Sequence, residues 1–166
     1  RASGRGVIVL SAHAGSWEWG AAFLALTAGP IHIAARAHPS RAVERRFARV
    51  RARLGERRLG GATLWPAASR ALRRGEWVAL MGDRPSARHG RDSTCAWAAA
   101  LARRTGALLL PALVLQLGDG RYRACFQAPL APEHCASGGY RDAMRRVLER
   151  HPGQWFAFEP LPEGLA

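Results

Sequence analysis

A closely spaced histidine and glutamate are the residues of this sequence best suited to chemistry. His13 and Glu18 stand in the segment SAHAGSWE, where Gly15 and Ser16 favour a tight turn that could bring the carboxylate back to the imidazole. A carboxylate on one ring nitrogen fixes the tautomer and raises the basicity of the other nitrogen. That second nitrogen can then take a proton from an attacking hydroxyl. The spacing therefore suggests general-base catalysis in which a substrate hydroxyl is the nucleophile.

The same spacing also has a plain structural explanation. A histidine and a glutamate in the pattern H-x-x-x-x-E occur together often by chance, and a lone histidine at a strand end is more often structural than catalytic. The position of His13 favours a site, however. Residues 6–12 form a short apolar run with β-branched side chains, which predicts a buried strand. His13 follows its carboxyl end, where open α/β sheets place their ligands.

The rest of the chain alternates between strand-like and helix-like segments. This alternation predicts an α/β fold in a single domain, with a mixed, mostly parallel central sheet flanked by helices. A hairpin through Gly118, Asp119 and Gly120 supplies the antiparallel part. We expect strands at 6–12, 31–36, 77–82, 108–117, 121–127 and 154–158, and helices at 16–27, 40–54, 66–74, 93–105 and 140–150.

Charge is the strongest signal in the composition. The chain has 166 residues, of which 48% are hydrophobic, and its 25 basic residues are all arginine against 12 acidic ones, for a net charge of +13. Such a charge attracts anions: phosphate, acidic lipid head groups, an acidic carrier protein or nucleic acid. No nucleic-acid motif or stacking aromatic pattern supports the last of these. The longest apolar run, 107–117, is about half the ~20 residues that a membrane-spanning helix needs.

The cysteines and the remaining histidines do not suggest a metal centre. The three cysteines are irregularly spaced and form no C-x-x-C pair, so we expect neither a zinc site nor a disulfide framework. The other histidines share no ligand spacing such as H-x-x-x-H; they are His32, His38, His89, His134 and His151.

The histidine block resembles the signature of a known enzyme family. Residues 6–18, GVIVLSAHAGSWE, resemble the H-x-G-N-W-E block of the bacterial lipid A biosynthesis (lauroyl/myristoyl) acyltransferases of the lysophospholipid acyltransferase superfamily, with Ser16 in place of the asparagine. Other family blocks have counterparts in the same order: IAAR at 33–36, LRRGEWVALMGDR at 72–84, LARRTGA at 101–107, DGRYR at 119–123 and HPGQWF at 151–156. This ordered set covers nearly the whole chain and is far more specific than any one block.

The resemblance implies a glycerolipid acyltransferase-like fold and transfer of a fatty acyl group to a lipid hydroxyl. The donor would be an acyl carrier protein or coenzyme A thioester, which is a co-substrate, and no cofactor is implied. His13 would be the general base and Glu18 its orienting partner. Arg36 would correspond to the family arginine that stabilises charge near the acyl or acceptor group. Asp83 would complete the site, with Arg84 beside it as a further substrate-binding residue.

The resemblance also implies a place of action. We expect a lipid acceptor, an anionic membrane surface and no nucleic acid as partners, and a location at the cytoplasmic face of the bacterial inner membrane. Residues 1–166 would form the acyltransferase domain. Members of the family carry a membrane helix before the histidine block, and only twelve residues precede His13 here. We therefore expect the natural protein to have an N-terminal anchoring region that this chain lacks, or to bind the membrane peripherally.

One segment departs from the family pattern. Residues 85–98 are short and contain no counterpart of the F-x-G-x-x-A-x-x-P-x-G stretch that helps to wall the substrate pocket. Two alternatives to the enzyme remain. One is a lipid- or carrier-binding pseudoenzyme that keeps the fold, although retention of both His13 and Glu18 favours activity. The other, suggested by charge alone, is a basic nucleic-acid-binding protein.

Overall fold

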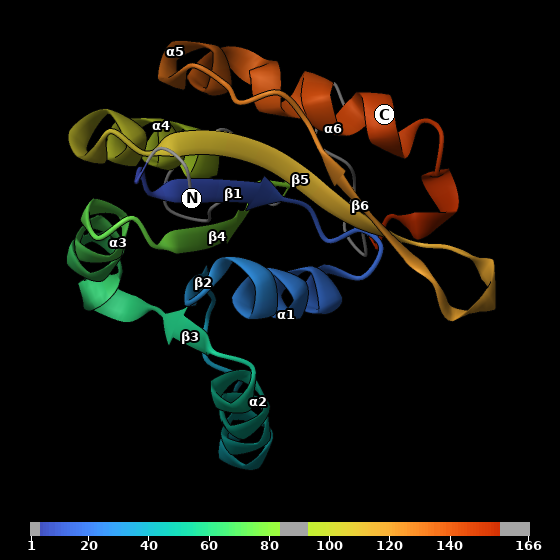
Figure 1. Ribbon diagram of the computed structural model, residues 1–166, viewed down its shortest axis with the longest axis horizontal. Coiled ribbons are helices and arrows are strands. Elements are labelled where there is room, and N and C mark those ends of the chain that lie inside the picture. Colours follow the sequence, from blue (N-terminus) through green and yellow to red (C-terminus); the bar gives the residue numbers. More distant parts are fainter. Residues whose placement is uncertain (1–3, 84–92, 157–166) are drawn as a thin grey trace.

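A single mixed sheet forms the centre of the part of the chain that the computed structural model describes, residues 4–83 and 93–156 (Figure 1). Its strand order is β3-β2-β4-β1-β5-β6. All neighbouring strands run parallel except β5 and β6, which are antiparallel. The mostly parallel α/β sheet expected from the sequence is thus confirmed. The strands are β1 (Val7–Ser11), β2 (Ile31–Ala34), β3 (Glu56–Leu59), β4 (Trp77–Met81), β5 (Leu108–Gln116) and β6 (Tyr122–Phe126).

Helices lie on both sides of this sheet (Figure 1). Helices α3, α4 and α6 pack on one face, α1 covers part of the other, and α2 stands apart at the end of the molecule beside β3. None of the described helices is long and apolar enough to span a bilayer. The helices are α1 (Trp17–Ala28), α2 (Arg41–Arg53), α3 (Leu64–Arg73), α4 (Ser93–Thr105), α5 (Pro132–His134) and α6 (Tyr140–Leu148).

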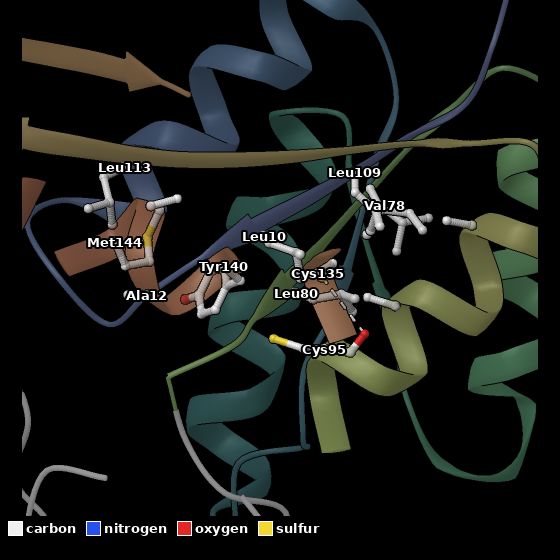
Figure 2. Packing of buried hydrophobic residues seen from close by; sticks show 14 of the residues in the cluster. Leu10, Ala12, Val78, Leu80, Cys95, Leu109, Leu113, Cys135, Tyr140 and Met144 are labelled. Carbon is white, nitrogen blue, oxygen red and sulfur yellow. Dashed lines mark hydrogen bonds between the residues drawn. The ribbon is translucent and has the colours of Figure 1, made fainter. Parts of the chain in front are cut away.

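The two faces of β1 contribute to two separate cores, because successive side chains of a strand point to opposite faces. Ile8 and Leu10 are fully buried in the larger core, among apolar side chains of α3, α4 and α6 (Figure 2). Val7 and Val9 belong to the smaller core on the α1 side, with Leu24 of that helix. Burial on both faces explains why residues 7–10 are continuously apolar rather than alternating.

The hairpin between β5 and β6 forms where the sequence predicts it. Its turn, Gly118–Gly120, is a short 3-10 segment, and Asp119 has a positive φ of 66°. Aspartate tolerates this left-handed conformation better than most residues, and the flanking glycines leave the chain free to reverse. This hairpin is the one antiparallel pairing among the named strands of the described residues.

The structure corrects the sequence prediction in two places. Strand β3 was not expected, because its sequence, ERRL, lacks the apolar pattern of a strand. Arg57 and Arg58 are exposed, and the segment is a strand because it pairs with β2 at the edge of the sheet. The expected strand at 154–158 is wrong. Pro152–Gln154 forms a 3-10 turn, and Trp155 makes only an isolated bridge to Ala14. Residues 157 and 158 lie outside the described part of the chain.

Candidate active site

Two neighbouring strands bring His13 and Asp83 together at the carboxyl edge of the sheet. His13 follows β1 and Asp83 follows β4, and these strands are parallel, with Ser11 opposite Met81. Asp83 Oδ1 lies 2.9 Å from Nδ1 of the imidazole, and the backbone N–H of His13 donates to Asp83 Oδ2 at 2.8 Å. One carboxylate therefore holds both the ring and the backbone of the histidine.

This arrangement determines what the imidazole can do. An ionised carboxylate only accepts hydrogen bonds, so Nδ1 carries the proton and Nε2 keeps its lone pair. Burial acts to raise the pKa of Asp83, whose side chain is 5% exposed, but the hydrogen bonds from the ring and amide of His13 outweigh burial and hold this pKa below its ordinary value. The imidazole itself is 24% exposed. His13 thus has the tautomer, the anionic partner and the access that a general base needs.

Glu18 does not take the position that the sequence suggested. Among the described residues no hydrogen bond joins its side chain to His13, and Asp83 occupies Nδ1 instead. Glu18 lies in the first turn of α1, with 48% of its side chain exposed, and Oε1 accepts a hydrogen bond from Nη2 of Arg51 at 2.8 Å. The expected tight turn exists, but it leads into a helix whose first turn points this carboxylate towards α2. A catalytic role for Glu18 stays a prediction.

The segment that carries His13 is fastened to β5 and to the last described residues. Gly15 N–H donates to the carbonyl of Gln154 at 2.7 Å, and Phe156 N–H donates to the carbonyl of His13 at 2.9 Å. Gly15 has a φ of +58°, and a Cβ there would lie 2.0 Å from the carbonyl oxygen of Val114. No other residue fits this position, because both its conformation and its contact with β5 exclude a side chain.

The side chain of Gln154, in the segment HPGQW, binds the backbone of β5, a contact that the sequence did not predict. Its amide group makes two hydrogen bonds with the backbone of Gln116, one accepted and one donated, each 2.8 Å long. This pair holds the turn at Pro152–Gln154 against the end of β5, and so positions the backbone that bonds Gly15. The glutamine therefore supports the histidine segment from a distance rather than meeting the imidazole.

Tyr140, at the start of α6, lies beside Ser11 and Gly82, which precede His13 and Asp83 in the sequence. Its side chain is 1% exposed, its hydroxyl donates to the carbonyl of Ser11 at 2.7 Å, and its ring fills the space beside Gly82, where a Cβ would approach within 2.7 Å (Figure 2). Burial, with the nearby charge of Asp83, raises the pKa of Tyr140 well above its ordinary value, so the hydroxyl remains a donor. Tyr140 thus fixes the ends of β1 and β4 just before His13 and Asp83.

Replacing Tyr140 by phenylalanine tests this positioning role. The change keeps the ring but removes the bond to Ser11, which is worth about 1 kcal/mol, and we expect kcat to fall about tenfold with KM little changed. Steady-state acyl-transfer kinetics would measure the effect, with Tyr122→Phe on exposed β6 as the matched control. A lower melting temperature with unchanged kcat would mean that Tyr140 supports only the fold.

An apolar cavity of about 60 Å³ lies between α1 and the sheet. Ser11, Trp17 and Glu18, which flank His13 in the sequence, are among the residues that line it. Trp17 also packs edge-on against the imidazole, with ring centroids 5.5 Å apart. A lining of this kind suits hydrocarbon and not a polar group. Its inner wall consists of Val9, Ile31, Ile33, Ala79 and Ala112.

The two arginines expected at the site have different outcomes. Arg36 is exposed just beyond β2, and β2 is the parallel neighbour of β4, so Arg36 lies at the same edge of the sheet as His13 and Asp83. No hydrogen bond or ion pair within residues 4–83 and 93–156 joins Arg36 to either residue. Arg84 lies outside the described residues.

Arg51 also connects Glu18 to a second, buried acid. Its Nε lies 3.8 Å from Oε2 of Glu56, whose side chain is 1% exposed. Burial raises the pKa of Glu56 from 4.5 to about 7, and the nearby charge of Glu18 raises it further than Arg51 lowers it. Between pH 4.5 and 7 the folded protein therefore binds more protons at Glu56 than the unfolded chain does. The free energy of unfolding contributed by this group falls as pH rises through that window.

The variant Glu56→Gln is expected to remove this pH dependence. Glutamine cannot ionise, so the free energy of unfolding at pH 8 should rise by about 1 to 3 kcal/mol relative to the parent, with little change at pH 4. Urea unfolding at both pH values would measure it, and Glu133→Gln, at a side chain 75% exposed, is the control. An equal difference at both pH values would contradict the role given to Glu56.

Nothing in the described part of the chain groups three His, Cys, Asp or Glu side chains closely enough to hold a metal ion. This edge of the sheet combines the histidine, its carboxylate partner and an apolar cavity beside them. A proton can be taken from a hydroxyl at Nε2 while hydrocarbon rests against α1.

Comparison with known proteins agrees with this chemistry. No curated protein sequence matches the chain. The family model of the bacterial lipid A biosynthesis acyltransferases matches residues 1–161, which is nearly the whole chain. It therefore includes the histidine segment, the aspartate after β4 and the glutamine turn that holds them. The chain belongs to the bacterial lipid A biosynthesis acyltransferase family and is an acyltransferase.

Proposed function

We propose that the protein transfers a fatty acyl group from an acyl carrier protein or coenzyme A thioester to the hydroxyl of a lipid A-like or glycolipid acceptor. The observation that carries this proposal is the His13–Asp83 pair, which lies two residues beyond Ser11 and Met81 in the lining of an apolar cavity. A base beside hydrocarbon-binding space suits a substrate that has both a hydroxyl group and an acyl chain. We propose further that the reaction takes place at the cytoplasmic face of the bacterial inner membrane, which a membrane lipid acceptor would favour.

In the proposed reaction His13 acts on the acceptor. Its Nε2 removes the hydroxyl proton as the oxygen attacks the thioester carbonyl, and Asp83 stabilises the imidazolium that forms. The tetrahedral intermediate then expels the thiolate, which takes the proton from the imidazolium. The products are the ester and the free thiol. Arg36, at the same edge of the sheet, would stabilise the negative charge on the carbonyl oxygen, and such a contact lowers a barrier by a few kcal/mol.

Mass spectrometry of the products tests the function directly. The purified protein would be incubated with acyl carrier protein thioester or coenzyme A thioester and a membrane lipid extract. We expect one lipid class to gain the mass of the acyl group while free thiol appears in equal amount. Transfer from one donor alone would identify that donor. Thiol release without an acylated lipid would mean hydrolysis and would overturn the proposed acceptor class, and an inert, folded protein would overturn the activity.

A further inference from the structure

Helix α2 has an apolar side that the described part of the chain covers only in part. None of its residues is buried. Val43, Phe47 and Val50 follow the helical spacing of three and four residues, so they lie on one side, and their exposed fractions are 36%, 42% and 49%. The exposed remainder of the helix is strongly basic: it carries Arg41, Arg45, Arg46, Arg49 and Arg53. A helix of this length normally depends on burying an apolar face, and here that face is only partly covered.

Helix α1 presents a second apolar stripe next to the first. Trp19, Phe23 and Leu26 have the same helical spacing and are 61%, 50% and 74% exposed. Between the two helices runs a groove of about 320 Å³. Trp19 lines it from α1, and Val43, Phe47 and Val50 line it from α2. Figure 1 shows α2 standing away from the centre of the sheet, at the end of the molecule beside β3.

We propose that the α1–α2 face, defined by these six apolar side chains and the arginines of α2, docks on an anionic lipid bilayer. A basic helix with Phe and Val on one side and arginine on the other has the composition of helices that lie in the membrane interface. By helical periodicity Arg46 and Arg53 lie beside the apolar stripe, where their long side chains can reach phosphates while Phe47 enters the acyl region. This inference concerns binding and does not depend on turnover.

Other occupants fit the face less well. A second copy of the chain would bring the arginines of two α2 helices together, and like charges oppose that contact. An acidic carrier protein would match the arginines, but charge matching alone gives no reason to expose six large apolar side chains on two helices. A bilayer surface satisfies both the charge and the apolar stripes.

The proposed orientation also brings lipid to the reaction. Glu18 lines both the groove between α1 and α2 and the apolar cavity beside the histidine segment. A bilayer seated on the α1–α2 face would therefore lie near the Glu18 side of that cavity. A lipid acceptor could then reach His13 without leaving the membrane completely.

Vesicle flotation tests the proposal with defined lipids. The protein would be mixed with vesicles of pure phosphatidylcholine or of phosphatidylcholine with phosphatidylglycerol, and bound protein would be measured after centrifugation. We expect binding to the anionic vesicles and little to the neutral ones. Replacing both Arg46 and Arg53 by glutamine should weaken binding about 30-fold, which corresponds to about 1 kcal/mol per arginine. Phe47→Ser with Val50→Ser should weaken it at least about tenfold.

The matched control removes the same charge elsewhere. Arg73→Gln with Arg104→Gln changes two exposed arginines on α3 and α4, on the other side of the sheet, and should change binding less than threefold (roughly 0.5 kcal/mol). Equal losses in both charge variants would overturn the proposal, because binding would then follow net charge. Absence of vesicle binding in the folded protein would also overturn it. The proposal would also be wrong if the α2 variants still bound vesicles but had lost binding to the acyl carrier protein, or had lost a dimer that the parent forms. Sedimentation would measure both.

Discussion

Replacing His13 by alanine is expected to lower the rate of acyl transfer by about a thousandfold or more. A positioned general base contributes about 10² to 10⁴ to a rate, and within residues 4–83 and 93–156 no second base adjoins Asp83 to replace it. Loss of the imidazole also leaves the carboxylate of Asp83 without its ring partner, which disturbs the charge at the site. Product formation measured by mass spectrometry over several hours would detect the remaining rate.

The control for this variant is a histidine outside the site. His38 is exposed in the segment before α2 and touches only its local neighbours, Ser40 among them, so His38→Ala should retain nearly full activity. If His13→Ala kept more than about a tenth of the rate while remaining folded, general-base catalysis by this histidine would be wrong (general bases contribute 10² or more). An acceptor that arrives already ionised would then be the simplest account.

The second large effect separates two carboxylates that the sequence could not tell apart. Asp83→Asn is expected to lower kcat about 10³-fold or more. The backbone N–H of His13 can only donate, so it keeps the amide oxygen of the new asparagine, and the NH₂ group then faces Nδ1. Nδ1 must accept this hydrogen bond, which moves the ring proton to Nε2. The lone pair that should take the hydroxyl proton is then lost.

Glu18→Gln provides the comparison. Glutamine can still accept the hydrogen bond from Arg51 through its side-chain oxygen, so we expect kcat to fall less than about tenfold, in line with the small value of exposed ion pairs. The two variants should be compared in one assay, with unfolding curves to show that both are folded. A larger loss for Glu18→Gln than for Asp83→Asn would show that Glu18 orients the imidazole during the reaction and that its pairing with Arg51 is given up when substrate binds.

Much of the fold follows from local sequence. The run Gly6–Ala12 is apolar because β1 is buried on both faces, and the paired glycines around Asp119 reverse the chain. Strand β3 could not be predicted in this way, since Arg57 and Arg58 lack the pattern of a strand and are held by their neighbour β2.

The site was predictable only in part, for a related reason. His13 and Asp83 each follow a recognisable strand, and parallel pairing then brings them together. The partner of Glu18 comes from another helix, and no pattern in the sequence near Glu18 predicts its pairing with Arg51. Tyr140 begins an ordinary amphipathic helix and gives no sign that its hydroxyl reaches Ser11, 129 residues away.

The 129 residues between Ser11 and Tyr140 affect the order in which the site can form during synthesis of the chain. The base near the start of the chain is held by Tyr140 and by the backbone at Gln154 and Phe156, so almost the entire domain must be present before the imidazole is organised. A chain still emerging from the ribosome would expose His13 early and yet lack the contacts that aim it, because domains are made from the N-terminus onwards. We therefore expect a nascent chain that ends before Tyr140 to lack acyl-transfer activity.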